Sequence, residues 1–311
     1  MEQLSRRDVA ALSVALGSAT LCGSLLKVQA QSESPLLRRA IAHGKGETLP
    51  VVGVGTSEVF DVGPNPNDRS GPTAVVQALV SGGGSLIDTA PSYGEAEKVV
   101  GDILASTGLR GKIFIATKLE EYQPGKEEAE ARECLRNLRA DKVDLIQLHN
   151  VRDPNQDMSG TNALKLRGIC RYTGITTTFE ESYGAAEAIL RRARPDFLEI
   201  DYAIDNRDAE KRVLPAAADA GTAVLVALPF GRGHLFRVAL GKKLPDWAAE
   251  FDCSSWGQFF LKFILGHPAI TAVIPGTNKA EHMVDNLAAG RGRMPDAKER
   301  ERMIKYVESL G

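Results

Sequence analysis

Cysteine, aromatic residues and long apolar runs are all scarce in this sequence of 311 residues. It has four cysteines, and their spacing forms neither a disulfide framework nor a metal-binding motif, so we expect no metal. Lys and Arg total 38 against 40 Asp and Glu and lie scattered among the acids, which argues against a nucleic-acid-binding protein. Beyond residue 30, no segment approaches the ~20 apolar residues that a stable membrane span needs. A chain of this length that is 43% hydrophobic can instead bury one large core.

The first thirty residues differ in character from the rest. Ser5-Arg6-Arg7-Asp8 precedes a weakly apolar stretch from Val9 to Leu26, and Val28-Gln29-Ala30 forms a small-residue exit. This order is that of a targeting peptide, and the paired arginines resemble a twin-arginine export signal. A frayed N-terminal helix is the alternative, whereas lipidation of Cys22 is disfavoured by the large residue before it. We expect residues 1–30 to engage the twin-arginine (Tat) translocon and the protein to be periplasmic.

Residues 31–311 alternate between strand-like and helix-like segments, a pattern typical of a single-domain (β/α)8 TIM barrel. Eight apolar, often β-branched runs predict the strands, at 51–54, 85–87, 113–116, 143–148, 172–176, 197–202, 223–228 and 270–274. Amphipathic stretches predict helices at 73–80, 95–104, 127–138, 182–192, 207–220 and 256–265. The segment between 149 and 168 is polar and short, and its helix has no clear position in the pattern.

Two additions to the plain barrel are expected. A glycine-centred pair of apolar pieces in residues 36–49 predicts a β-hairpin ahead of the first strand, and 278–287 and 296–310 predict extra C-terminal helices. A doubly wound open sheet is the competing fold, but it requires a glycine-rich turn that leads directly into a helix. Here Gly53-Val54-Gly55-Thr56 runs into a long polar loop, 57–71, which favours the barrel.

Polar side chains stand where three consecutive predicted strands end. Asp88 ends the second strand, Lys118 the third and His149 the fourth, and Tyr93 lies in the loop after the second. Each alone has an ordinary explanation, as a helix cap, a solvated charge, a structural histidine or a packing aromatic. Because the carboxyl ends of neighbouring barrel strands meet around one site, we expect these four side chains to form an active site together.

These residues resemble the aldo-keto reductases. The resemblance runs from about residue 53 to residue 290 and implies a (β/α)8 barrel, a nicotinamide cofactor bound without a Rossmann fold, and interconversion of a small-molecule carbonyl and its alcohol. In that family a glutamate at the position of His149 accompanies reduction of activated carbon–carbon double bonds, so the histidine favours carbonyl reduction. The motifs that carry the resemblance are Ile87-Asp88-Thr89-Ala90 with Tyr93-Gly94, Ala116-Thr117-Lys118, 143–150 (VDLIQLHN), and Ile274-Pro275-Gly276-Thr277 with His282 and Asp285-Asn286.

The chemistry of the four side chains supports those roles. Hydride addition to a carbonyl builds negative charge on the oxygen, which must be protonated or stabilised as it forms. We expect Tyr93 to be the general acid, with the Lys118 cation lowering its pKa and Asp88 holding Lys118 charged and oriented. His149 can donate a second hydrogen bond to the same oxygen.

The resemblance also implies a cofactor site, with NADP(H) favoured over NAD(H). Thr176-Thr177 stands where members usually carry Ser-Asn, and Glu199 replaces a usual glutamine. Ala227 replaces a nicotinamide-stacking tyrosine, and Gly276 and His282 replace the Lys and Arg that pair with a 2′-phosphate. A helix N-terminus near residue 278 favours phosphate, and small residues at 231–233 permit close backbone approach. The expected contacts are Gly55, Thr56, Asp88, Thr176, Thr177, Glu199, Leu228, Phe230, Gly231, Gly233, Thr277, Lys279, His282 and Asn286.

A substrate pocket and two rival functions complete the expectations. Phe60, Trp247 and Phe251 are candidate pocket walls because they lie in long loops. A Schiff-base aldolase that uses Lys118 is one rival, although Asp88 should keep that lysine charged. The other is a nicotinamide-nucleotide-binding barrel with a sensor or subunit role and little catalysis, which the altered cofactor residues favour. Export adds a further expectation, that the cofactor is loaded before the folded protein leaves the cytoplasm.

Overall fold

A computed structural model describes residues 34–65, 67–120 and 125–311 of the chain. The chain divides into residues 1–35 and a compact unit of residues 36–311, and the fold below is that of the second unit. The predicted export signal, residues 1–30, lies outside the described residues.

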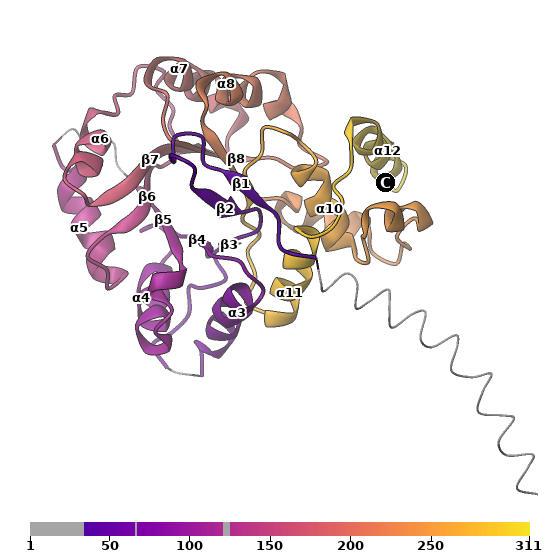
Figure 1. Cartoon of the computed structure of the whole chain (residues 1–311), viewed down its shortest axis with the longest axis horizontal. Helices are drawn as coiled ribbons and strands as arrows, with labels where there is room; N and C mark the ends of the chain where they lie inside the picture. Colours follow the sequence, from indigo (N-terminus) through magenta and orange to yellow (C-terminus); the bar gives the residue numbers. More distant parts are fainter. Residues whose placement is uncertain (1–33, 66, 121–124) are drawn as a thin grey trace, which may run out of the picture. The chain divides into compact units, whose positions relative to one another are not determined.

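Eight strands form the central sheet of this unit, in the order β3 to β10, and each pairs in parallel with the next (Figure 1). Isolated bridges from Val52 to Val273 and from Gly55 to Gly276 join the first strand to the last, so the sheet closes into the predicted (β/α)8 barrel. The strands are β3 (Val54–Gly55), β4 (Leu86–Asp88), β5 (Phe114–Leu119), β6 (Val143–Leu148), β7 (Cys170–Thr177), β8 (Phe197–Asp201), β9 (Ala223–Ala227) and β10 (Ala272–Val273).

Helices surround the barrel, and the predicted additions are present at both ends of the unit (Figure 1). An antiparallel hairpin of β1 (Arg38–Ala40) and β2 (Thr48–Pro50) precedes β3, and two helices follow β10. The α-helices are α3 (Ser70–Ser81), α4 (Ala96–Thr107), α5 (Glu127–Asn137), α6 (Ser159–Leu166), α7 (Tyr183–Ala193), α8 (Val213–Ala220), α9 (His234–Val238), α10 (Trp256–Leu265), α11 (Ala280–Ala289) and α12 (Ala297–Glu308).

Two helices differ from the sequence prediction. The segment 207–220 is not one helix but a short 3-10 turn, Asp208–Lys211, followed by α8. Pro215 is the physical reason, because it lacks an N–H and fits only the first turn of a helix, so a helix that contains it begins shortly before it. The helix that the sequence left unplaced between 149 and 168 is α6.

Alternation along the strands determines what fills the barrel. An apolar cluster separate from the outer core takes its members from consecutive strands and from the hairpin; among them are Leu86, Phe114, Leu145, Phe197 and Leu225. Side chains two residues apart on a strand point to the same face. The residues two or four positions after these apolar ones therefore also point into the barrel, in a layer nearer the carboxyl ends of the strands. That layer is polar and consists of Asp88, Lys118, Gln147 and Glu199.

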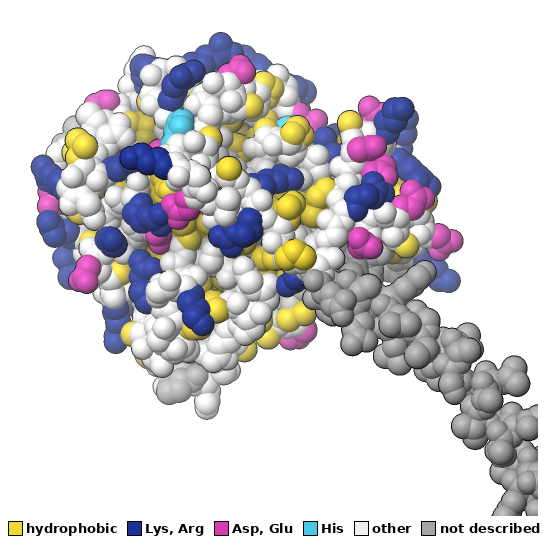
Figure 2. All heavy atoms as spheres, in the orientation of Figure 1, with side chains coloured by type: hydrophobic (Ala, Val, Ile, Leu, Met, Phe, Trp, Pro, Cys, Tyr) yellow, Lys and Arg dark blue, Asp and Glu magenta, His cyan; other side chains and the backbone are white. Residues whose placement is uncertain are grey.

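The opposite end of the barrel carries a second, larger cavity, and several of the charges around it are paired. It measures about 850 Å³ and is lined by the hairpin and the amino ends of strands. Arg171 contacts both Glu47 and Asp144, and Arg110 lies 3.9 Å from Asp144. Figure 2 shows basic and acidic side chains interspersed on one face of the molecule rather than gathered by sign. The chemistry predicted from the sequence lies at the other end of the strands.

Within the described ranges, no helix has the length and apolar character to cross a bilayer. The same part of the chain holds no group of three His, Cys, Asp or Glu side chains placed to bind a metal ion. Cys134, Cys170 and Cys253 are buried as free thiols.

Candidate active site

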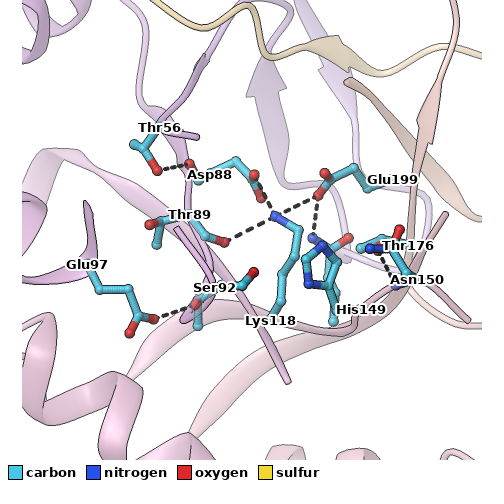
Figure 3. A network of polar contacts seen from close by, with 12 residues as sticks. Thr56, Asp88, Thr89, Ser92, Glu97, Lys118, His149, Asn150, Thr176 and Glu199 are labelled. Carbon is cyan, nitrogen blue, oxygen red and sulfur yellow. Dashed lines mark hydrogen bonds and ion pairs between the residues drawn. The ribbon is translucent and has the colours of Figure 1, made fainter. Parts of the chain in front are cut away.

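The polar layer at the carboxyl ends of the strands holds a fully buried lysine. Lys118 Nζ lies 2.6 Å from Asp88 Oδ2 and 3.2 Å from Glu199 Oε2 (Figure 3). It also donates to the carbonyl oxygen of Thr89 at 3.1 Å. The Asp88 contact was predicted, but the Glu199 contact comes from β8 on another side of the barrel and was not. Two carboxylates therefore share one ammonium out of contact with solvent.

The charged groups in this cluster shift one another's pKa values. Burial opposes the charge on Lys118, but the nearby Asp88 and Glu199 outweigh it and raise the pKa of the ammonium. Burial and, next, the Glu199 carboxylate raise the pKa of Asp88 well above its usual range, despite the ammonium beside it. Lys118 consequently stays cationic, which is unfavourable for the neutral amine that a Schiff-base aldolase requires.

Tyr93 lies in the loop between β4 and α4, with its ring beside Lys118. Lys118 Nζ is 5.0 Å from the ring centre, and the ring meets that of His149 edge-on at a centroid distance of 6.1 Å. Lys118 does favour the phenolate, as expected, but the predicted net lowering of the pKa is wrong. Burial first, and then the Asp88 and Glu199 carboxylates, outweigh the ammonium and raise the pKa of Tyr93. The phenol therefore keeps its proton in the free protein.

Gln147 completes the polar layer and was not singled out from the sequence. Its Nε2 donates to Glu199 Oε2 at 2.9 Å, and its Oε1 is buried without a hydrogen-bonding partner among the described residues. Gly174 stands opposite it on β7, where an added Cβ would lie 3.1 Å from Gln147 Cγ and 2.8 Å from the Phe197 carbonyl oxygen. Glycine at this position leaves room for the layer. Because side chains alternate between the two faces of a strand, the inward position of Leu145 indicates that Gln147, two residues later, also points inward.

His149 also has a partner that the sequence did not indicate. Its Nδ1 lies 2.7 Å from Oε2 of Glu120, the residue that follows β5. Oε1 of the same carboxylate accepts hydrogen bonds from the Ser92 N–H at 3.1 Å and the Ser92 hydroxyl at 2.6 Å. Burial opposes ionisation of Glu120, but the hydrogen bonds from His149 and Ser92 outweigh it and lower the pKa of the carboxyl to about 2.

A cavity of about 470 Å³ adjoins these side chains. Tyr93 and His149 line it together with Asn150, whereas the buried Lys118 does not face it. The structure thus brings the four residues of the predicted active site together, three of them on the cavity wall and the lysine behind. The predicted cofactor residues that line it are Gly55, Thr56, Asp88, Glu199, Leu228, Phe230 and Gly233.

The hydroxyls expected to face the cofactor from β7 are turned elsewhere. Thr176 Oγ1 accepts from the Asn150 N–H at 2.8 Å, and Thr177 Oγ1 donates to the Phe179 carbonyl at 3.3 Å. Both are buried and neither lines the cavity, but Thr178 does. Asn150 has a positive φ of 49° and a buried Oδ1 that has no partner among the described residues. Thr178 and Asn150 are therefore the polar groups available where Thr176 and Thr177 were expected.

The loop after β9 approaches the cavity with unusual backbone. Leu228 and Arg232 have φ of 53° and 52°, and both line the cavity. A bulky residue in this conformation is an outlier that clusters at functional sites. Gly231, with φ of 55°, is a predicted contact that does not line the cavity itself; a Cβ there would lie 2.6 Å from Asp205 Oδ2.

The predicted phosphate-binding residues lie at the start of α11. Thr277 Oγ1 accepts from the Lys279 N–H at 3.1 Å and lies 3.5 Å from His282 Nδ1. Lys279 and His282 are exposed, whereas Thr277 and Asn286 are buried. None of the four lines the 470 Å³ cavity, but Gly276, directly before them, does. They form a polar group with one lysine, which continues in sequence from Gly276 at the cavity wall.

The aromatic residues expected as pocket walls belong to the core. Phe60 and Phe251 are fully buried, and Trp247 packs against Phe251 and Tyr306 at centroid distances of 6.0 and 5.8 Å. None of the three lines the cavity, so this prediction is wrong. Trp247 and Phe251 pack against Phe259 of α10, and Trp247 also against Tyr306 of α12, where burial of large apolar rings stabilises the fold. Phe230 is the phenylalanine that lines the cavity.

The closed barrel places Tyr93, His149 and Asp88 on one cavity at its carboxyl end, with Lys118 paired to Asp88 and buried behind them. These features are those expected of a (β/α)8 oxidoreductase. The sequence model described as "Aldo/keto reductase family" matches residues 51–301 of the chain. The protein therefore belongs to the aldo/keto reductase family.

Individual relatives are distant in sequence and similar in fold. The chain is 27% identical over 248 residues to methylglyoxal reductase YeaE of Escherichia coli, covering 78% of this chain and 85% of the relative. It is 27% identical over 254 residues to the aldo-keto reductase str7 of Strobilurus tenacellus, covering 69% and 75%. An aldo-keto reductase from Klebsiella pneumoniae in complex with NADPH superposes with a TM-score of 0.72 at 22% identity, covering 87% of this chain and 95% of that one.

Proposed function

We propose that this protein reduces an aldehyde or ketone to the alcohol with NAD(P)H and that Tyr93 is the general acid. The observation that carries the proposal is the convergence of Tyr93, His149 and Asp88 on one cavity, with Lys118 buried beside Tyr93 and paired to Asp88. A buried ammonium that does not face the cavity acts on the tyrosine rather than directly on a substrate.

The cluster assists proton transfer by stabilising the tyrosinate that forms when Tyr93 gives up its proton. A reduced nicotinamide, when bound, supplies the hydride that converts the carbonyl into an alkoxide. The raised pKa of Tyr93 keeps its proton in place until negative charge develops on the substrate oxygen. After transfer, the tyrosinate lies beside the Lys118 cation, which Asp88 holds in position. Lys118 thus contributes mainly after the proton has moved.

The residues around the cavity fit a nicotinamide nucleotide. The unpartnered, buried Oδ1 of Asn150 can accept from a carboxamide N–H, and the Thr178 hydroxyl lines the same cavity. Residues 228–230, 232 and 233 line the cavity, and the glycine at 233 leaves its backbone accessible to a pyrophosphate. Lys279, exposed at the N-terminus of α11, supports NADP(H) over NAD(H), because a cation and a helix N-terminus both favour a 2′-phosphate.

The test measures binding and turnover separately. Quenching of protein fluorescence by NADPH and by NADH gives the two dissociation constants, and a panel of aldehydes, ketones, sugars and quinones then tests for NADPH oxidation. We expect tighter binding of NADPH and turnover with at least one carbonyl. Binding without turnover on any carbonyl would favour the sensor or subunit function, and absence of nucleotide binding would refute the proposal.

Glu199 is predicted to bias the site toward the oxidised nucleotide. It adds a second acidic group to a cluster that holds one ammonium, and a carboxylate at this point of the cavity wall favours the cationic nicotinamide ring. A charge interaction of this kind is worth on the order of 1–2 kcal/mol at an effective dielectric constant near 20. Glu199→Gln should therefore raise the ratio of the dissociation constants for NADP⁺ and NADPH about tenfold. Titration of both nucleotides gives this ratio, and an unchanged ratio would contradict the bias.

We also propose that residues 1–30 direct export by the twin-arginine route and that the protein acts in the periplasm with nucleotide loaded beforehand. The paired arginines at 6 and 7 support this, and the lack of disulfides among the described cysteines is compatible with folding in the reducing cytoplasm. Replacing both arginines with lysine should leave the protein in the cytoplasmic fraction. Mass spectrometry of the periplasmic protein should find bound nucleotide, and its absence would refute loading before export.

A further inference from the structure

We infer that Glu120 is a positioning residue that holds His149 with a proton on both ring nitrogens, so that Nε2–H can donate to the substrate carbonyl oxygen. This inference rests on the proposed function, because it concerns the second hydrogen-bond donor of the same reaction.

Glu120 is held on both of its carboxylate oxygens. Oε1 accepts from the N–H and the hydroxyl of Ser92 at 3.1 and 2.6 Å, and Oε2 faces His149 Nδ1 at 2.7 Å. The backbone N–H of Glu120 donates in turn to the Glu130 carboxylate on α5. His149 is also fixed at its backbone, where its N–H donates to the Leu119 carbonyl at 3.0 Å. The two side chains therefore meet in a defined geometry.

The hydrogen bonds leave one assignment for Nδ1. An ionised carboxylate has no hydrogen to give, so Nδ1 must donate the hydrogen in the contact with Glu120. A neutral imidazole with its hydrogen on Nδ1 has a lone pair at Nε2. Such a ring would present that lone pair to the carbonyl oxygen of a substrate, and the two acceptors would repel. The donor function of His149 consequently requires a second proton, and the adjacent carboxylate is the group that stabilises the resulting cation.

Glu120 itself does not titrate in the range where the enzyme would be assayed. The pKa of its carboxyl is lowered in the folded state to about 2, so its contribution to stability is complete above the unfolded value of about 4.3 and is lost as pH falls toward 2. A change in rate between about pH 5 and pH 9 that depends on Glu120 therefore reports the imidazole.

Other charged groups face His149 from the surrounding elements. On the Tyr93 side, the buried cluster has two carboxylates and one ammonium, which also favour a cationic ring. On the other side, an Arg and an Asp line a second cavity of about 430 Å³ with Glu120 and His149, and their charges oppose one another. Among the described residues, these groups are Glu120, Tyr93, Lys118, Asp88, Glu199, Arg152 and Asp153, and the cavity that His149 shares with Tyr93 also has Glu58 and Arg232 on its wall.

The first test is the pH dependence of carbonyl reduction by Glu120→Gln. The amide can still accept from Nδ1 but carries no charge, so the imidazolium loses its stabilising partner. We expect kcat/KM near neutral pH to fall by about tenfold to a hundredfold, the range found when the outer partner of a metal-bound histidine is removed. We also expect the alkaline decline of the rate to begin at lower pH. Glu133→Gln removes one exposed negative charge from α5 and is the matched control, with an unchanged profile.

The second test reads the protonation state without turnover. The chain has five histidines, so a ¹⁵N spectrum of labelled protein compared with that of His149→Gln assigns the ring nitrogens of His149. Near neutral pH, both nitrogens should be protonated in the native chain, and Glu120→Gln should lose one proton. A neutral ring in the native chain, or an imidazolium that persists in Glu120→Gln, would overturn the inference. Neither result requires turnover, so they stay distinguishable from failure of the proposed function.

Discussion

Tyr93→Phe is expected to lower kcat/KM for carbonyl reduction by roughly 10² to 10⁴-fold, the contribution of a positioned general acid. The substitution removes the proton donor and leaves the ring that packs against His149 and faces Lys118. Nucleotide affinity should be unchanged, because the change removes one hydroxyl and no charge in the free protein. Initial rates with the best carbonyl substrate, together with NADPH titration, measure both quantities.

The matched control for this variant is Tyr306→Phe. Tyr306 is on α12, and its hydroxyl donates to the Lys243 carbonyl at 3.2 Å. Loss of this hydroxyl should leave kcat/KM unchanged. If Tyr93→Phe retains most of the wild-type rate, Tyr93 is not the general acid, and His149 becomes the first candidate. If the variant also loses nucleotide binding, its lost rate would not report proton transfer.

Lys118→Met should abolish reduction and destabilise the fold. The substitution leaves the Asp88 and Glu199 carboxylates buried without a cation, and removing one partner of a buried ion pair typically costs about 3–5 kcal/mol in the free energy of unfolding. The deficit should depend on pH. A carboxyl whose folded pKa is raised destabilises the folded state at neutral pH, and this penalty disappears as pH falls and the group protonates. Denaturant unfolding near pH 7.5 and pH 5 should show the larger deficit at the higher pH.

Two comparisons separate charge from packing in that experiment. Lys262 is also fully buried, but its Nζ donates to the carbonyls of Arg291 and Arg293 at 2.6 and 2.9 Å. Lys262→Met should therefore lack the pH-dependent deficit and should leave reduction active. Combining Lys118→Met with Asp88→Asn and Glu199→Gln should restore stability without restoring activity. A Lys118→Met deficit that is equal at both pH values would show that the buried carboxylates are not its cause.

Much of the site could be predicted from where the strands end and from the alternation of side chains along them. A run such as Val143–Leu148 is apolar, β-branched and short, so its end, and the position of His149, can be read locally. Asp88, Lys118 and Tyr93 follow by the same reasoning, because parallel strands present their carboxyl ends at one mouth. The same alternation also indicates Gln147, which has an inward position directly between Leu145 and His149.

Other features depend on the closed barrel. Glu120 and Ser92 are distant in sequence from His149 and look like ordinary polar loop residues, and Glu199 reaches Lys118 from a strand three places away around the sheet. The aromatic residues at 60, 247 and 251 lie in loops by sequence, but Phe60 and Phe251 are buried in the core and Trp247 packs against it. Nothing local in those segments indicates which way their side chains turn.

The amino-acid order by itself determined the succession of strands and helices, the barrel class and the four side chains at the strand ends, because these depend on periodicity and on chain direction. The tertiary structure alone decided that Glu199 joins Asp88 beside Lys118 and that Glu120 stands beside His149, and, through burial and these charges, in which direction the pKa of Tyr93 shifts. The physical reason is that desolvation and charge pairing depend on distances and on the exclusion of water. Both arise when strands far apart in the chain close into one barrel.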